Sequence, residues 1–185
     1  MKRLAIGVLS VLMVACFAAA GLAQHQVKNP RATSDLTLKG KTVSVEYGRP
    51  SLRGRTTDAL LGKLPAGGFW RLGSNQSTTF KTEIDLAFGD VTVPAGEYSL
   101  WMQRQEDNSW KLVFNKQHGQ FGAKEPDQPG SGHDPTQDFA SVSLKESKPA
   151  MSVEMLTLAL SKAHDGGTLT IEWGTLKVAA SFKAK

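Results

Sequence analysis

Hydrophobic residues alternate with polar ones in several separate segments, and this period of two constrains the fold more than any other feature. The alternation is found at 42–47, 78–88, 97–103, 109–114, 168–173 and 175–182. Successive side chains of a β-strand point to opposite faces, so the pattern predicts strands that bury one face against a core. Turn-forming residues, mainly Gly, Pro, Asp and Asn, separate the segments. We therefore expect an all-β chain.

Many short strands joined by turns predict an antiparallel β-sandwich, jelly-roll or immunoglobulin-like, formed by one domain over 35–185. At most one short helix is expected, near 57–63. The stretch 152–160 alternates imperfectly, and we interpret it as a strand rather than a helical turn. Residues 115–138 have no periodicity and are rich in Gly, Pro and Asp. A loop of this length is functional or disordered.

The first 23 residues are typical of a secretory signal peptide. Lys2 and Arg3 precede an apolar run, and small residues follow it, which predicts cleavage after Ala23. We expect a periplasmic or secreted protein, with a polar linker at 24–34 and no transmembrane segment after cleavage. Lipidation of Cys16 is the alternative, which the apolar residues after it disfavour.

The net charge and the cysteine content bear on two questions: whether the protein binds nucleic acid, and whether disulfide bonds stabilise it. The formal charge is +5, and two of these charges belong to the signal peptide. The small positive charge that the cleaved chain keeps does not indicate a nucleic-acid partner. Cys16 is the only cysteine, so the cleaved chain has no disulfide and its hydrophobic core must hold it together.

The stretch YGRPSLRGR, residues 47–55, places three arginines close together although like charges repel. Proline and glycine give this loop a defined shape, and WRLGSNQS (70–77) adds another arginine beside polar residues. Guanidinium groups grip carboxylate, sulfate or phosphate, so we expect an anionic small molecule or a glycan as ligand. The alternative is that the arginines pair with acids or brace the loop. The predicted ligand-binding residues are Arg49, Arg53, Arg55, Arg71, Asn75 and Trp101.

Trp101 is included because it alternates with Leu100 and Met102 and shares a face with Ser99 and Gln103. An exposed tryptophan on a sheet can stack on a sugar, but the loop at 115–138 could equally cover it. The other tryptophans in alternating segments, Trp110 and Trp173, are expected in the core.

No motif for a catalytic nucleophile or a phosphate-binding loop is present. His118, His133, Asp134 and Asp138 match no metal-ligand spacing, and we expect solvated loop side chains there. The carboxylates Glu46, Glu83 and Asp85 show no spacing that singles them out as an acid–base pair. We predict no catalytic residue, metal site or cofactor.

Several segments together resemble one bacterial family. They are VEYGRPSLRGR (45–55), FWRLGSNQSTTF (69–80), VPAGEYSLW (93–101), WKLVFNK (110–116) and LTIEWGTLKV (169–178). In this order they resemble domain-of-unknown-function family 2911 (DUF2911). The resemblance implies an exported, largely β protein without an assigned activity, and it supplies no catalytic residues.

The leading hypothesis for function is a non-catalytic binding module for a polar or anionic small molecule or glycan. The alternative is a structural or interaction protein of the cell envelope, in which the arginine loop only braces the fold. An unrecognised hydrolase is the least expected of the three.

Overall fold

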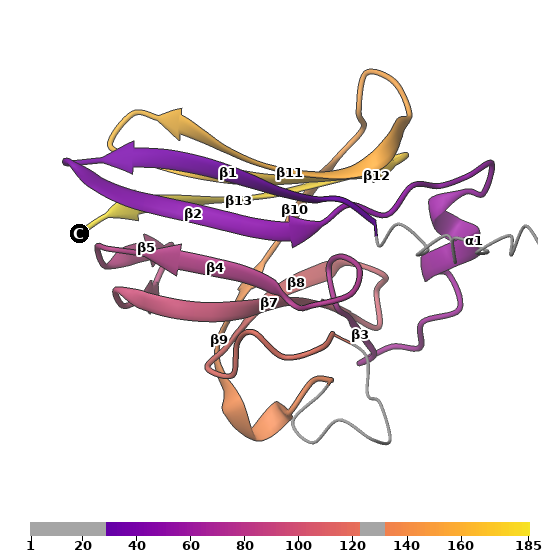
Figure 1. The fold of residues 1–185 in the computed structure, drawn as a ribbon, viewed down its shortest axis with the longest axis horizontal. Coiled ribbons are helices and arrows are strands. Elements are labelled where there is room, and N and C mark those ends of the chain that lie inside the picture. The colour runs from indigo at the N-terminus through magenta and orange to yellow at the C-terminus, as the bar shows by residue number, and fades with distance from the viewer. Residues whose placement is uncertain (1–28, 123–131) are drawn as a thin grey trace, which may run out of the picture.

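The computed structural model describes residues 29–122 and 132–185. In these residues the chain forms two antiparallel sheets that face each other as layers of a sandwich (Figure 1). This confirms the predicted antiparallel β-sandwich. The predicted signal peptide, its Cys16 and the first part of the expected linker lie outside the described residues. None of the described helices is long and apolar enough to cross a membrane.

The first sheet has the order β1-β2-β4-β7-β8-β9, with β3 paired to β7. Short turns join β1 to β2 and β7 to β8, whereas longer segments connect the other neighbouring strands. Its strands are β1 (Arg31–Leu38), β2 (Lys41–Gly48), β3 (Phe69–Trp70), β4 (Thr78–Thr82), β7 (Gly96–Arg104), β8 (Trp110–Asn115) and β9 (Asp138–Ser143).

The second sheet has the order β11-β12-β13-β5-β6, with β10 paired to β13. Its strands are β5 (Leu86–Phe88), β6 (Val91–Val93), β10 (Lys145–Ser147), β11 (Val153–Ala163), β12 (Gly166–Gly174) and β13 (Leu176–Ala184). The imperfectly alternating stretch at 152–160 is therefore a strand, as predicted.

Two sequence predictions need correction. The stretch 78–88 is not one strand, because β4 ends at Thr82 in the first sheet and β5 begins at Leu86 in the second. The Thr82 hydroxyl bonds the Ile84 carbonyl at 2.5 Å and stabilises the turn that carries the chain across. The expected linker is also shorter than 24–34, because β1 begins at Arg31, which pairs with Gly48.

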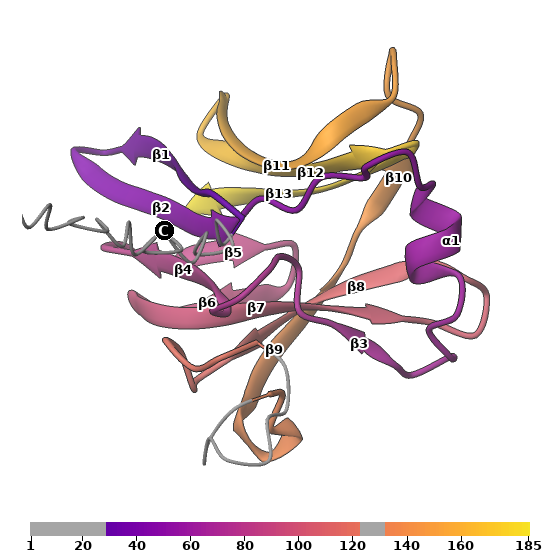
Figure 2. The same ribbon diagram turned by 45° about the vertical axis from the view of Figure 1, so that its right-hand side comes forward.

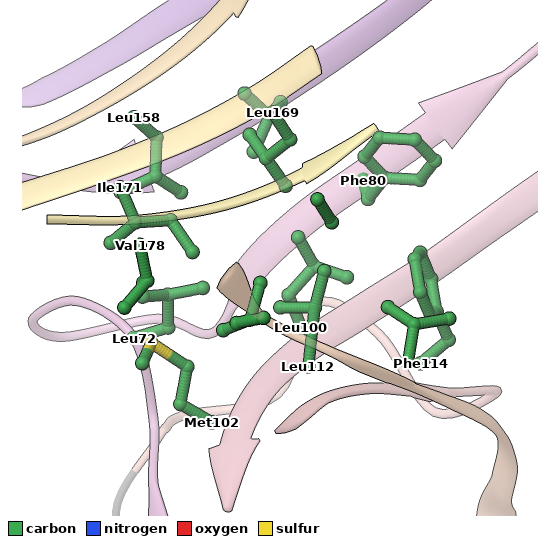
Figure 3. Close-up of a cluster of buried hydrophobic side chains, with 14 of the residues drawn as sticks. Leu72, Phe80, Leu100, Met102, Leu112, Phe114, Leu158, Leu169, Ile171 and Val178 are labelled. Carbon is green, nitrogen blue, oxygen red and sulfur yellow. The ribbon is translucent and has the colours of Figure 1, made fainter. Parts of the chain in front are cut away.

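The core lies between the layers, and both sheets contribute alternate side chains to it (Figure 3). Leu100, Met102 and Leu112 of the first sheet face Leu169 and Ile171 of the second, and all five are fully buried. Trp110 and Trp173 are also buried, as predicted. A single continuous core explains how the fold manages without a disulfide in the described residues.

The expected short helix is α1 (Thr57–Leu61). Thr56 caps it, since its hydroxyl accepts a hydrogen bond from the Ala59 amide at 3.1 Å. The buried Thr57 hydroxyl donates to the Trp173 carbonyl at 2.8 Å. These contacts hold α1 at one end of the sandwich, near β3 (Figure 2). A 3-10 helix at Pro135–Gln137 leads into β9.

Candidate functional site

The first arginine of the 47–55 loop braces the edge of the second sheet. Arg49 Nε donates to the Leu156 carbonyl at 3.1 Å, and its Nη2 donates to Thr157 Oγ1 at 3.3 Å. β11 is an edge strand, and unpaired polar groups on a buried edge are costly. Arg49 therefore stabilises a strand that lies far from it in sequence.

The backbone of the same loop follows this edge. The Leu52 amide donates to the Glu154 carbonyl and the Leu156 amide to the Pro50 carbonyl, both at 3.0 Å. The Glu154 carboxylate accepts hydrogen bonds from the Ser51 hydroxyl and, at 2.9 Å, from the Arg53 amide. These bonds, that from Ser51 first, hold the pKa of Glu154 below its ordinary value.

The other two arginines of the loop differ in their environments. Arg55 Nε donates to the Leu52 carbonyl at 2.9 Å, which closes the loop on itself. Arg53 is exposed, and its side chain makes no hydrogen bond or ion pair with the residues described here. Two of the three guanidinium groups are thus bound to carbonyl oxygens, that of Leu156 for Arg49 and that of Leu52 for Arg55.

Glycine at position 48 joins the arginine loop to the loop at 71–77. A Cβ on Gly48 would lie 2.2 Å from the Ser74 carbonyl oxygen, so only glycine permits this approach. Within the second loop, Asn75 has a φ of 63° and its carbonyl accepts from the Gly122 amide at 2.8 Å. Gly122 also abuts Arg71, since a Cβ there would lie 2.8 Å from Arg71 Cδ.

A groove of about 390 Å³ lies between α1, the segment after it, and β3. Its apolar wall includes Leu60, Leu61 and Leu64. Three aromatic residues, Phe69, Trp70 and Trp101, and two cations, Lys63 and Arg71, also line it. We call these surfaces together the aromatic groove. It brings together two of the predicted residues, Arg71 and Trp101, with Asn75 adjoining through Gly122.

Trp70 is fixed from behind by the core. Its ring stacks on that of Trp173 with centroids 5.5 Å apart and planes 12° from parallel. Trp101 is 3% exposed, and its Nε1 donates to Ser99 Oγ at 2.9 Å. The sequence allowed Trp101 to be either exposed on the sheet or covered. The structure shows that it is covered, so its ring is not an open surface on which a sugar could stack.

His133 forms part of that cover, which corrects the expectation of a solvated histidine. Its ring stacks on Phe69 at 3.8 Å and lies 5.1 Å from Trp101 between centroids. His133 Nε2 is 2.8 Å from Asp138 Oδ1. The pairing of β8 with β9 brings this segment over the outer face of β7, which no local sequence pattern reveals. His118 is exposed beside Glu97.

Arg71 lines the groove where Gly122 abuts it. The residue is half-buried, and its guanidinium makes no hydrogen bond or ion pair with any residue in the part of the chain that the structure describes. A guanidinium without a partner can donate two parallel hydrogen bonds to a carboxylate or phosphate. Arg71 therefore gives the apolar groove the capacity to bind an anion.

The carboxylates considered for acid–base chemistry lie elsewhere and have structural partners. Glu46 pairs with Arg31 at 2.6 Å, and Glu83 accepts from the Thr42 amide at 2.8 Å. Asp85 accepts from the Ala95 amide at 2.8 Å. Within 29–122 and 132–185, no group of His, Cys, Asp and Glu is arranged to hold a metal ion.

Sequence reasoning missed Lys63, Phe69 and Trp70 as members of this site. Phe69 and Trp70 reach it because β3 pairs with β7, through Phe69–Gln103 and Trp70–Met102. β3 has only two residues, too few to show alternation.

Comparison with known proteins yields one finding. Residues 29–182 match the family described as protein of unknown function (DUF2911). No curated protein and no solved structure matches the chain.

Proposed function

From the premise that the chain belongs to the DUF2911 family, which has no known function, we propose a binding protein for a small amphipathic anion. The ligand carries an acidic group and an apolar body, and it occupies the aromatic groove. The observation that carries the proposal is the Arg71 guanidinium, which has no partner in the described residues and lies on the wall of a largely apolar groove. This favours an anionic small molecule over a neutral glycan among the ligand classes that the sequence suggests.

The charge of the groove supports this ligand class. Arg71 is joined by Lys63, which is exposed and forms no ion pair in the described residues. A guanidinium binds a carboxylate through two parallel hydrogen bonds, and low polarity around it strengthens the attraction. The acidic group of the ligand therefore binds Arg71, with Lys63 adding attraction from the rim.

The shape and rigidity of the groove support an apolar body. Small-molecule sites are concave, mostly apolar and preformed. Trp70 is held by Trp173, Phe69 by His133, and Trp101 by Ser99. Rings that are already fixed lose little conformational entropy on binding, so a flat or aliphatic ligand gains contact area at small cost.

The first experiment is a thermal-shift titration with matched probes. Indole-3-acetate, benzoate, decanoate and glucuronate are compared with indole-3-acetamide, which has the same apolar body without the charge. At one hundred times its dissociation constant a ligand adds about 2.7 kcal/mol to stability. This raises the melting temperature of a chain of this size by roughly 5–11 °C.

We expect an apolar acid to stabilise the protein and its amide to have little effect. Arg71→Gln should abolish the shift, whereas the control Arg53→Gln, at an exposed arginine outside the groove, should retain it. Equal shifts for acid and amide, or an unchanged shift in Arg71→Gln, would contradict the proposal, as would the absence of any shift.

A second candidate is the structural role in the cell envelope. Arg49 and Arg55 favour it, because both use their guanidinium groups to bond backbone carbonyls. The two roles are compatible in different parts of the molecule, since neither arginine lines the aromatic groove.

We further propose that the protein is exported to the periplasm or secreted. The support is the charged, apolar and small-residue order of residues 1–23. Mass spectrometry of the periplasmic fraction should find a chain that begins at Gln24. An intact Met1 in the cytosolic fraction would contradict export, and a lipid on Cys16 would replace cleavage after Ala23 with lipoprotein processing.

A further inference from the structure

We propose that the end of the sandwich opposite α1 carries a second site, which binds a phosphate-bearing anion. Three parts of the chain meet there: the β1–β2 turn, the β11–β12 turn and the end of β13 (left side of Figure 1). Each contributes a lysine, namely Lys39, Lys162 and Lys183. We call this surface the basic end. It shares no residue with the aromatic groove.

The basic end is hollowed, although its three lysines are exposed. It has a volume of about 470 Å³ and is lined by the three lysines together with Leu38, His164, Asp165 and Ala184. Leu38 is 4% exposed and belongs to the core. Lys39 Nζ donates to the Ala184 carbonyl at 3.2 Å, which joins the β1–β2 turn to β13. The hollow is therefore built by contacts between distant segments.

The lysines of the hollow lack acidic partners. None of the three lies within 4.0 Å of a carboxylate in the described residues, although ion pairs form elsewhere, as between Lys177 and Glu172 at 3.0 Å. Among the described residues that line the hollow, Asp165 is the one acid. Three like charges in one concave surface repel each other and raise the local positive potential, and a bound anion relieves that repulsion.

The kind of cation selects the kind of anion. Lysine presents a compact ammonium on a flexible stem, whereas the planar guanidinium of arginine matches two oxygens in one plane. Ammonium groups from three segments that line one hollow suit a tetrahedral group with several charged oxygens. A phosphate group has this form, either in a soluble molecule or in the headgroup of an anionic lipid.

Two assays distinguish these sources. Calorimetric titration with inorganic pyrophosphate at low ionic strength measures the soluble form. Co-sedimentation with vesicles of phosphatidylglycerol in phosphatidylcholine, against vesicles of phosphatidylcholine alone, measures the lipid form. The test variant is Lys162→Gln with Lys183→Gln, which keeps Lys39 and its bond to Ala184. The control is Lys145→Gln with Lys148→Gln, which removes the same charge from exposed lysines outside the hollow.

We expect at least one probe to bind, with affinity reduced tenfold or more in the test variant and little changed in the control. Binding of pyrophosphate identifies a soluble ligand, and binding of phosphatidylglycerol vesicles alone identifies a lipid headgroup. Equal losses in both variants would show a general effect of charge and overturn the proposal, as would the absence of binding to either probe. Arg71→Gln should not alter these results, so failure here is separate from failure at the aromatic groove.

Discussion

Arg49 and the carbonyl it bonds are 107 residues apart in the chain. Through this contact one side chain ties the loop after β2 to the edge of the opposite sheet. The sequence indicates that proline and glycine give this loop a defined shape. It does not reveal the hydrogen-bond partner of Arg49, because a hydrogen bond to a distant strand follows no local spacing. A residue that is ambiguous between ligand binding and bracing is therefore resolved by its distant contacts.

Removal of this side chain should destabilise the fold. Arg49→Ala leaves the Leu156 carbonyl without its side-chain donor, and we expect a loss of about 1–3 kcal/mol, measured by thermal or urea unfolding. Arg53→Ala, whose side chain is exposed, should change stability by only about 0.5 kcal/mol. Equal effects of the two substitutions would refute the bracing role.

Gly48 controls the approach of the two loops near the candidate site. An alanine there would place Cβ 2.2 Å from the Ser74 carbonyl oxygen, and backbone atoms on both sides cannot rotate away. We expect Gly48→Ala to cost about 3 kcal/mol, at the upper end for overpacking. Unfolding by urea measures the loss.

The matched control is Gly54→Ala in the same loop. Gly54 has a φ of 74° but nothing within 4 Å of an added Cβ, so only the strain of the left-handed conformation remains, about 1–2 kcal/mol. A larger loss at Gly54 than at Gly48 would show that conformation, and not close approach, dominates this loop.

At the scale of elements, alternation predicts most strands because it reports directly which face is buried. It fails at 78–88 because Phe80 and Leu86 keep the same parity and are both buried, although they belong to different sheets. The hydrophobic residues fall on even-numbered positions both before and after the chain passes from the first sheet to the second, so the alternation does not show where one strand ends and the next begins. Of the residues in the aromatic groove, the sequence predicts only Arg71 and Trp101 as binding residues. The others come from α1, the segment after it and β3, which tertiary packing brings to the groove.

The contact between the arginine loop and β11 should depend on pH. The folded-state pKa of Glu154 lies below its ordinary value of 4.5, chiefly because it accepts hydrogen bonds from Ser51 and Arg53. A lowered pKa contributes stability above the unfolded-state value, and this is lost as the pH falls through the folded-state value. Glu154→Gln should therefore lower the melting temperature at pH 7.

The difference between this variant and the natural chain should shrink as the pH is lowered through and below 4.5. Melting curves recorded across this range provide the measurement. A difference that stays constant with pH would show that the carboxylate charge contributes nothing at this position.

At the scale of the molecule, the sandwich has two chemically distinct ends. The end at α1 holds aromatic rings with Arg71 and Lys63, and the opposite end holds three lysines around a hollow. The two sheets are joined by residues that are far apart in sequence. Examples are the hydrogen bonds of Arg49 with Leu156 and of Ser34 with Leu160. To form such a topology, the chain must bring distant segments together, at a cost in conformational entropy, before the contacts between them stabilise it.

We expect slow folding for this reason. Domains dominated by non-local strand pairing fold in milliseconds to seconds, and refolding from urea monitored by tryptophan fluorescence should fall in that range. A chain that regains its native signal within microseconds would be inconsistent with the two-sheet topology described here.

The same topology affects the chain during its synthesis. The inner face of β2, with Val43 and Val45 fully buried in the finished fold, is completed early in translation. The strands β11 to β13 that face the first sheet are synthesised later. We therefore expect the nascent chain to expose this hydrophobic surface until residues 153–185, which form β11 to β13, have been made.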